Sequence, residues 1–317
     1  MTILSRHAPA IIADKLRKLF EPTLDPGRVA RVFHEFDEKR GYRAYHEYCQ
    51  TRLARSIPDG GPDALESDGF QLVEVMDKCA AARLLTDTAQ TGAESYLKRD
   101  SRKLKGYAVR DSRRVEVMLA QALCAEVDAL ALRFFRSEYL VHWFTVSRTA
   151  PGSGPPSVSF RWHCDKGPRT HLKLLVYLND ASEHGGGTAF VDLAQTASLA
   201  ASGYLFGRGR RRTTSLGDLS RMACATLEAH PFSVRAGAGV VFQPARVLHS
   251  GIAPDCGSRF VLTLCLLPSP VEWRAALAAD TLTDLAHHPL WHAHADELRR
   301  CLGEPLDAGG GSRAAAG

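Results

Sequence analysis

Six short apolar runs in the second half of the chain constrain its fold more than any other feature. They begin at Tyr139 and read YLVHWFTVSR, SVSFRWHCD, HLKLLVYLND, GTAFVDL, FSVRAGAGVVFQP and RFVLTLCLLP, with glycine and proline between them. Runs rich in Val, Leu, Phe and Tyr with this punctuation are typical of strands. The intervals leave no room for crossover helices, so a mostly antiparallel sheet is expected. Two facing sheets, as in a jelly roll or barrel, would close such a set.

The regions on either side of these runs have helical patterns, so an α+β fold class is expected. Residues 1–135 are predicted to form a helical N-terminal region, whose strongest helix runs from Arg113 to Phe135 without Gly or Pro. Residues 136–270 form the predicted β core, and a loop-like or lid-like insertion at 194–230 interrupts it. Residues 271–302 return to helix, and the tail 303–317 is expected to be disordered.

Composition narrows the functional classes. A hydrophobic fraction of 45% and a charged fraction of 24% are ordinary for a soluble globular chain. The formal charge of +5 fits an anionic small molecule as well as a polyanion, and it does not by itself favour a nucleic-acid ligand. The eight cysteines contain no CxxC pair and indicate reduced thiols in a cytoplasm. No run approaches the roughly 18 apolar residues that span a bilayer, and the start lacks a signal-peptide core, so a cytoplasmic protein is expected.

The stretch RWHCDKG places a histidine and an aspartate two residues apart. Because side chains at i and i+2 share one face of a strand, His163 and Asp165 are expected to project together. His249, at the end of the apolar strand in VVFQPARVLHSG, offers a third ligand. Alone, the HxD pair is more often two polar residues on a strand than a metal site. With the third residue, two histidines and one carboxylate leave three metal positions open, as in non-haem Fe(II) oxygenases.

Arg259 follows His249 by ten residues, at the start of the next apolar run. If 2-oxoglutarate is a cosubstrate, a guanidinium at this reach can grip its far carboxylate with two parallel hydrogen bonds. Thr263 has the same strand parity and can add a hydroxyl. Lys173 and Tyr177 share parity on the HLKLLVYLND strand and are expected to face the interior, where a role toward 2-oxoglutarate or substrate competes with simple packing.

The order of HCD, LKLLVYLND, GGGTAFVDL, AGAGVVFQPARVLHSG and GSRFVLT resembles the Fe(II)/2-oxoglutarate-dependent dioxygenases. The YLN and GGGTAF segments are similar to the prolyl 4-hydroxylase-like branch, and the tryptophan before the first ligand is similar to the phytanoyl-CoA hydroxylase-like branch. The resemblance covers about residues 139–268 and implies a double-stranded β-helix that uses Fe(II), 2-oxoglutarate and O₂. Position by position, it implies that His163, Asp165 and His249 are the catalytic iron ligands and that Arg259 anchors 2-oxoglutarate.

Two comparisons with this family shape the expected reaction. Prolyl 4-hydroxylases generally carry lysine where Arg259 stands, which counts against peptidyl-proline as the substrate. Halogenating relatives replace the aspartate with a small residue, so the presence of Asp165 favours hydroxylation, desaturation or ring formation. The expected substrate is a small polar or anionic metabolite, such as an amino acid, a sugar acid or a natural-product intermediate.

Other classes of protein remain as alternatives. A protein side-chain hydroxylase of the prolyl type is the alternative within the same chemistry, and a non-catalytic, cupin-like metal-binding module is the alternative outside it. Arg259 counts against such a module, which needs no cation at this reach from His249. A hydrolytic zinc site is less favoured because no obvious general base accompanies the three ligands.

The remaining polar clusters are predicted to be surface features. The basic runs LKRDSRKLKGYAVRDSRR and GRGRRR are interpreted as solvated faces, with attraction of an anionic substrate as the alternative. Nucleic-acid demethylases are expected to carry a second arginine six residues after the first, where this chain has Cys265. Four histidines in the predicted C-terminal helix are interpreted as solvated or capping residues: His287, His288, His292 and His294.

Overall fold

The structure, a computed structural model, describes residues 42–60, 63–91, 93–96, 104–108, 112–152, 158–165, 170–204, 206 and 212–278. The described strands are β1 (Phe70–Glu74), β2 (Ala93–Tyr96), β3 (Leu104–Ala108), β4 (Glu138–Thr149), β5 (Leu172–Tyr177), β6 (Gly187–Val191), β7 (His230–Phe232), β8 (Ala238–Phe242), β9 (Leu248–Ile252) and β10 (Arg259–Ser269). The α-helices are α3 (Tyr42–Thr51), α4 (Ala64–Ser67), α5 (Lys78–Thr91), α6 (Ser112–Ala122), α7 (Ala125–Phe135), α8 (Leu193–Ala201), α9 (Leu216–Ala223) and α10 (Trp273–Ala278), and the short 3-10 helices are η2 (Val158–Phe160) and η3 (Ala181–Glu183).

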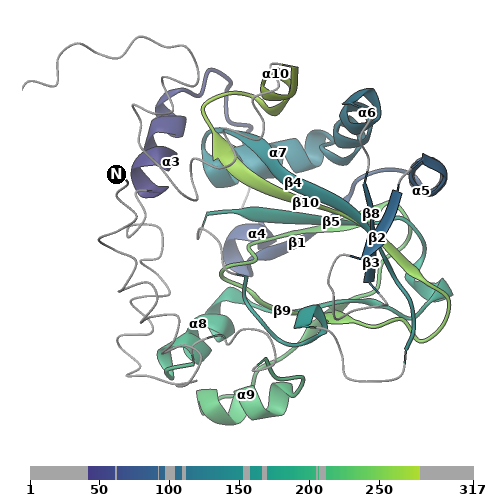
Figure 1. Cartoon of the computed structure of the whole chain (residues 1–317). Coiled ribbons are helices and arrows are strands. Elements are labelled where there is room, and N and C mark those ends of the chain that lie inside the picture. The colour runs from purple at the N-terminus through teal and green to yellow at the C-terminus, as the bar shows by residue number, and fades with distance from the viewer. Residues whose placement is uncertain are drawn as a thin grey trace, which may run out of the picture.

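The strands form two sheets that face each other (Figure 1). The larger sheet has the order β1-β8-β5-β10-β4-β3-β2, and the smaller has the order β7-β6-β9. Every pairing between the described strands is antiparallel. The expected antiparallel jelly-roll core is therefore confirmed.

Successive residues along the strands of the larger sheet lie in two different environments. Leu172, Leu174 and Val176 of β5 pack in the main apolar core with α6 and α7. Lys173 and Tyr177 of the same strand point to the opposite face, toward the smaller sheet, because successive strand residues alternate. That inner face is the surface on which a site between the sheets can form.

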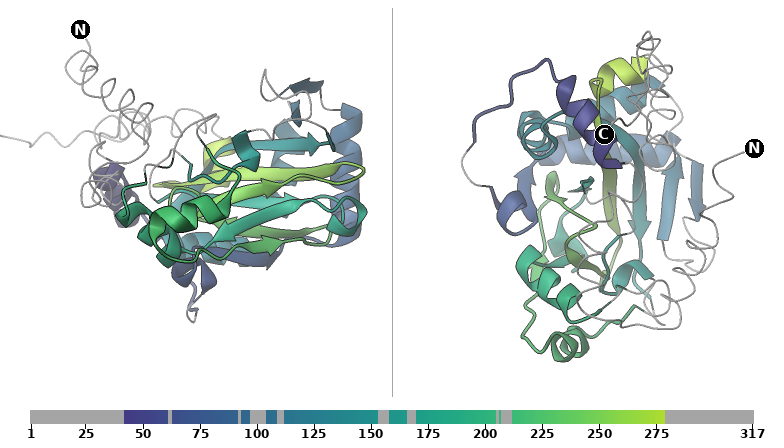
Figure 2. Two further views of the ribbon diagram at one scale, coloured as in Figure 1. Left: turned by 90° about the horizontal axis from the view of Figure 1, so that it is seen from below. Right: turned by 90° about the vertical axis from the view of Figure 1, so that its left-hand side faces the viewer.

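Helices cover the two outer sides of this sandwich. Helices α6 and α7 lie on the side of the larger sheet, whereas α8 and α9 lie on the side of the smaller sheet (Figures 1 and 2). Leu199 of α8 and Leu219 of α9 pack with Ala189, Val191 and Leu248 of the smaller sheet. The predicted insertion at 194–230 thus contains two helices, and its role as a lid remains a prediction.

Two expectations about the first 135 residues are wrong. The helix predicted from Arg113 to Phe135 is broken into α6 and α7, because Cys124 adopts extended backbone angles and precedes a new helix. The break allows apolar residues of both helices to enter the same core. In addition, β1, β2 and β3 lie in a region that was expected to be helical, and β1 pairs with β8 along the edge of the larger sheet.

Several predicted features lie outside the described residues. They are the first predicted helix, most of the two basic runs, the four C-terminal histidines and the tail 303–317. Within the part of the chain that the structure describes, no helix is both long and apolar enough to cross a membrane.

Candidate metal centre

His163 and His249 are brought together by the backbone. The two residues form an isolated antiparallel bridge, with N–H···O distances of 3.0 and 2.9 Å. The Asp165 N–H donates to the carbonyl of Pro244 at 2.7 Å, so a second backbone hydrogen bond holds the segment two residues after His163. The expectation that His163 and Asp165 lie on a regular strand is wrong, since residues 161–165 form only this bridge. The side chains still converge, because the backbone of β9 holds the segment in place.

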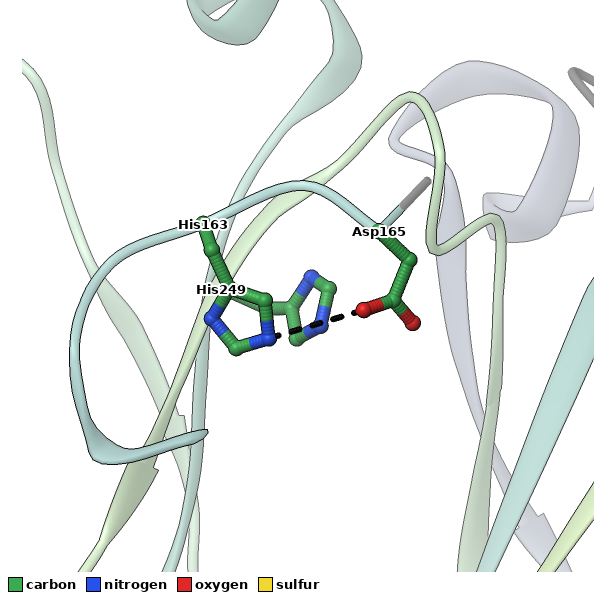
Figure 3. Close-up of side chains that lie close together, drawn as sticks. All are labelled: His163, Asp165 and His249. Atoms are coloured by element: carbon green, nitrogen blue, oxygen red, sulfur yellow. Dashed lines mark ion pairs between the residues drawn. The ribbon is translucent and has the colours of Figure 1, made fainter. Parts of the chain in front are cut away.

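The three side chains form a cluster that could hold a metal ion (Figure 3). One ligand atom of each of His163, Asp165 and His249 lies within 4.8 Å of the others. The imidazole ring centroids are 4.2 Å apart, and His163 Nε2 lies 3.6 Å from Asp165 Oδ1. The predicted trio is thus brought together, and its role as an iron site is considered below.

Each histidine has the tautomer that a metal ligand needs. His163 Nδ1 lies 2.6 Å from the carbonyl oxygen of Arg161, and His249 Nδ1 lies 2.8 Å from that of Val247. A carbonyl can only accept, so each Nδ1 carries the proton and each Nε2 has a free lone pair. Burial, together with the neighbouring imidazole, lowers the pKa of His163 to about 2, and burial lowers the pKa of His249 to about 4. Both rings are therefore neutral at pH 7.

Asp165 is ionised and tied to a lysine. Burial alone would raise the pKa of the Asp165 carboxyl, but Lys173 and the two imidazoles together lower it. The Lys173 ammonium donates to Asp165 Oδ2 in a short ion pair. The same ammonium lies 5.2 Å from the ring centroid of Trp143 on β4. Lys173 was predicted to face the interior, and it does so at the metal end of the site.

Arg259 lies at the other end of the inner face. Its Nη1 donates to the carbonyls of Gly187 and Ile252, the latter at 3.3 Å, and its guanidinium lies 5.4 Å from the ring centroid of Phe160. Arg259 Nε is completely buried and has no hydrogen-bond partner within the described ranges of the chain. Among the residues that the structure describes, no carboxylate forms an ion pair with Arg259, whose pKa burial lowers.

Tyr177 lies beside this arginine. Its hydroxyl is fully buried and lies 2.8 Å from Thr188 Oγ1 of the smaller sheet, and its electrostatic interaction with Arg259 places the two groups near each other. Thr263 lies on β10 opposite Leu175, on the same face as Arg259. No sequence motif marks Thr188, because its contact with Tyr177 is set by the packing of one sheet on the other.

Two further groups near the cluster were not singled out by motif. Trp143 is 38% exposed although it lies on the inner face of β4. Arg212, the last residue of GRGRRR, lowers the pKa of both His163 and His249 and donates to the carbonyl of Val158 at 2.9 Å. This part of the insertion therefore lies near the two histidines of the cluster. Only the register of the strands and the path of the insertion reveal these neighbours.

No protein-family model and no curated protein matches the chain. Among solved structures, it is similar to the epimerase SnoN from nogalamycin biosynthesis, solved with Fe³⁺, alpha ketoglutarate and nogalamycin RO, at 18% identity and a TM-score of 0.49 over 71% of this chain and 84% of that one. It is also similar to HygX from Streptomyces hygroscopicus with nickel, 2-oxoglutarate and hygromycin B, at 17% identity and a TM-score of 0.45 over 65% and 85%. An oxidoreductase of the 2OG-Fe(II) oxygenase family from Burkholderia pseudomallei matches at 14% identity and a TM-score of 0.44 over 70% and 97%. The residues of this chain, rather than these likenesses, are the basis for assigning its function.

Proposed function

We propose that the protein is an Fe(II)- and 2-oxoglutarate-dependent oxygenase that hydroxylates a C–H bond of a small polar or anionic metabolite. The observation that carries the proposal is the pairing of a two-histidine, one-carboxylate cluster with Arg259, whose Nε is buried and which has no carboxylate partner among the described residues. A metal site alone fits many proteins. A cation at the other end of the same inner face favours an anionic ligand that reaches from the metal cluster to the Arg259 guanidinium.

The donor set fits a divalent first-row metal. His163 and His249 would each offer a neutral Nε2, and Asp165 would offer one carboxylate oxygen. These three donors leave three positions of an octahedral ion open. With iron, 2-oxoglutarate and dioxygen bound, the centre would couple C–H hydroxylation to the conversion of the keto acid into succinate and CO₂.

The span between the two ends fits a short dicarboxylate. Ile252, whose carbonyl accepts from Arg259, lies three residues after His249 on β9, which is roughly 10 Å along an extended strand. A keto acid bound to the metal at one end would place its far carboxylate at the guanidinium. The buried Arg259 Nε–H, which has no partner in the described part of the chain, and the hydroxyl of Tyr177 are donors available to that carboxylate.

The surroundings of the metal cluster support a polar or anionic substrate. Lys173 and Arg212 both act on His249 as positive charges, so cations from two separate segments lie near the cluster. Trp143 adds an exposed aromatic surface beside Lys173. Cations next to one aromatic face suit a compact molecule with an anionic group better than an extended apolar chain. A prolyl-type protein hydroxylase and a cupin-like module without activity are the alternatives.

The first experiment tests the metal, the keto acid and its anchor together. The protein would be purified without oxygen, loaded with Fe(II) and titrated with 2-oxoglutarate, while the visible metal-to-ligand charge-transfer band of the chelate is recorded. The Asp165→Ala variant should show no band. The Arg259→Ala variant should show the band only at about 100-fold higher 2-oxoglutarate, because it loses a charge-assisted hydrogen-bond pair.

A surface arginine provides the matched control. The Arg235 side chain is 61% exposed and pairs with Glu74, whose side chain is 54% exposed, so Arg235→Ala should titrate like the wild type. Absence of a band in folded, iron-loaded wild-type protein would reject the proposed function. A wild-type band followed by succinate release on addition of candidate metabolites would support it, and release only with peptides would favour the protein hydroxylase.

A further inference from the structure

Lys173 makes a contact that the coordination of a metal does not require. Its ammonium is bound to Asp165 Oδ2, while Asp165 Oδ1 is the oxygen that faces His163. The lysine and aspartate side chains are only 18% and 21% exposed, so this is a largely enclosed ion pair. A carboxylate with one oxygen held by an ammonium has one oxygen left for a metal.

The number of oxygens that Asp165 offers decides how many positions stay open. One oxygen and two imidazoles leave three positions, which is the number that a two-point keto acid and dioxygen together need. A carboxylate that binds through both oxygens would leave two. We propose that Lys173 is a positioning residue that keeps Asp165 a one-oxygen ligand and so preserves the third open position. This inference rests on the proposed function, because it concerns the same centre.

Three adjacent strands hold the lysine in this position. Lys173 of β5 and Trp143 of β4 each pair with Cys265 of β10, which lies between them. The lysine side chain passes over Cys265, so that its ammonium lies over the Trp143 ring while it contacts Asp165. The small buried thiol leaves room for this crossing. The indole face adds a cation–π contact that keeps the ammonium from swinging toward solvent.

The charge of Lys173 has a second effect on the same position. Asp165 alone would partly neutralise a divalent ion, and the ammonium offsets that negative charge. The centre is therefore more positive toward an incoming carboxylate when Lys173 is present. Both effects act in one direction, because they favour the keto acid at the open positions over a second bond from Asp165.

The test compares Lys173→Met with wild type in two measurements made without oxygen. Lys173→Met keeps the length of the side chain and removes its charge. With Co(II) and no keto acid, the ligand-field absorption should differ from that of the wild type, because Asp165 gains a second bond. With Fe(II), about tenfold more 2-oxoglutarate or greater should be needed to reach half of the charge-transfer band.

Lys78→Met is the matched control, because Lys78 also pairs with an aspartate, Asp180, but is 67% exposed and lies on the surface. It should match the wild type in both measurements. An unchanged Co(II) spectrum in Lys173→Met would overturn the proposal even if 2-oxoglutarate binds more weakly, because the lysine would then act on the keto acid directly. An unchanged 2-oxoglutarate titration would overturn it as well.

Lys173→Arg covers the case in which the methionine variant fails to fold or to bind metal. Arginine keeps a cation that can hold Oδ2, so its titration should stay within about threefold of the wild type. A loss as large as the tenfold expected for methionine would overturn the proposal. Failure of the proposed function is distinguishable, because it would appear as the absence of a band in the wild type itself.

Discussion

His249 and the Arg259 guanidinium lie at opposite ends of the β6–β9 strand pair. His249 lies opposite Phe190 in the β6–β9 ladder, and Arg259 donates to the carbonyl of Gly187, three residues before Phe190. The distance between the metal donors and the cation is therefore set by strand spacing rather than by flexible side chains. A ligand that bridges the two ends meets a preformed span, which lowers the conformational cost of binding.

The buried histidines should make the metal-free protein less stable in mild acid. Because burial lowers the pKa of His249 from 6.5 to about 4, the unfolded chain takes up a proton below pH 6.5 that the folded chain does not. Stability should therefore be constant above pH 6.5 and fall as the pH drops toward 4, by roughly 3 kcal/mol from this residue alone. Urea unfolding at pH 7, 5.5 and 4.5 measures this slope.

The variant His249→Gln removes the titrating group and provides the comparison. Its free energy of unfolding should depend less steeply on pH between 6.5 and 4 than that of the wild type, because one proton uptake is gone. Equal slopes for the two proteins would contradict the assignment of a neutral, buried His249.

A second prediction concerns the segment that carries α3. Arg55 forms two hydrogen bonds with the Glu138 carboxylate, at 2.8 and 2.7 Å, and two with the Asp128 carboxylate, at 3.0 and 3.3 Å. Glu138 is almost completely buried, so Arg55→Met leaves an enclosed carboxylate without its cation. We expect a loss of about 2 kcal/mol in the free energy of unfolding, at the low end for a buried pair because Arg55 is partly exposed.

Two further variants test whether the loss of the buried ion pair causes this destabilisation. Arg235→Met breaks an exposed pair with Glu74 and should cost less than about 0.5 kcal/mol. In the double variant Arg55→Met with Glu138→Gln, much of the lost stability should return, because the unpaired charge is gone. A cost that persists in the double variant would mean that packing of the arginine stem, rather than charge, holds the segment.

The clustering of His163, Asp165 and His249 was predictable from sequence because its signals are local. His163 and Asp165 stand two residues apart, and His249 stands ten residues before Arg259. A bridge to β9, rather than the expected regular strand, brings the first two residues to the third. The i and i+2 spacing still predicts their convergence, because a regular strand and a single bridge both point these two side chains to one side.

The surroundings of the trio could not be predicted in the same way. The contact of Lys173 with Trp143 depends on β10 lying between β5 and β4, an order that no segment of sequence states. The contact of Tyr177 with Thr188 depends on how the two sheets face each other. The break at Cys124 also lacks a local signal, since the flanking residues are good helix formers and only packing of both helices requires it.

A third prediction concerns Gly187, whose carbonyl accepts a hydrogen bond from Arg259. A Cβ on Gly187 would lie 2.3 Å from the carbonyl oxygen of Phe232 on β7, which is backbone and cannot move aside cheaply. Gly187→Ala should therefore push β6 from β7 and cost about 2 kcal/mol or more of stability. It should also weaken 2-oxoglutarate binding, because the displaced carbonyl positions Arg259.

Gly217→Ala is the control for this substitution. A Cβ there would meet only Ser215 Oγ at 3.8 Å, and the residue lies in helix α9, where alanine is favoured over glycine. Its stability should be unchanged or higher by less than about 1 kcal/mol. Equal effects at the two positions, measured by thermal unfolding, would contradict the crowding of β6 against β7.

The last prediction separates the two ends of the site through Tyr177. Tyr177→Phe removes the hydroxyl that lies 2.8 Å from Thr188 Oγ1 and near Arg259. Metal affinity should stay within about twofold of the wild type, because the metal ligands lie at the other end. The 2-oxoglutarate concentration at half of the charge-transfer band should rise about tenfold, the effect of one lost hydrogen bond to a charged group.

Stability measurements on Thr188 decide whether this effect belongs to the ligand or to the fold. Tyr177→Phe leaves the buried Thr188 hydroxyl without its partner and should cost about 1 to 2 kcal/mol. Adding Thr188→Val should return part of that stability, since both polar partners are then gone. If 2-oxoglutarate binding stays weak in this double variant, the Tyr177 hydroxyl acts by binding the keto acid. Recovery of binding together with stability would instead give Tyr177 a purely structural role, joining the two sheets.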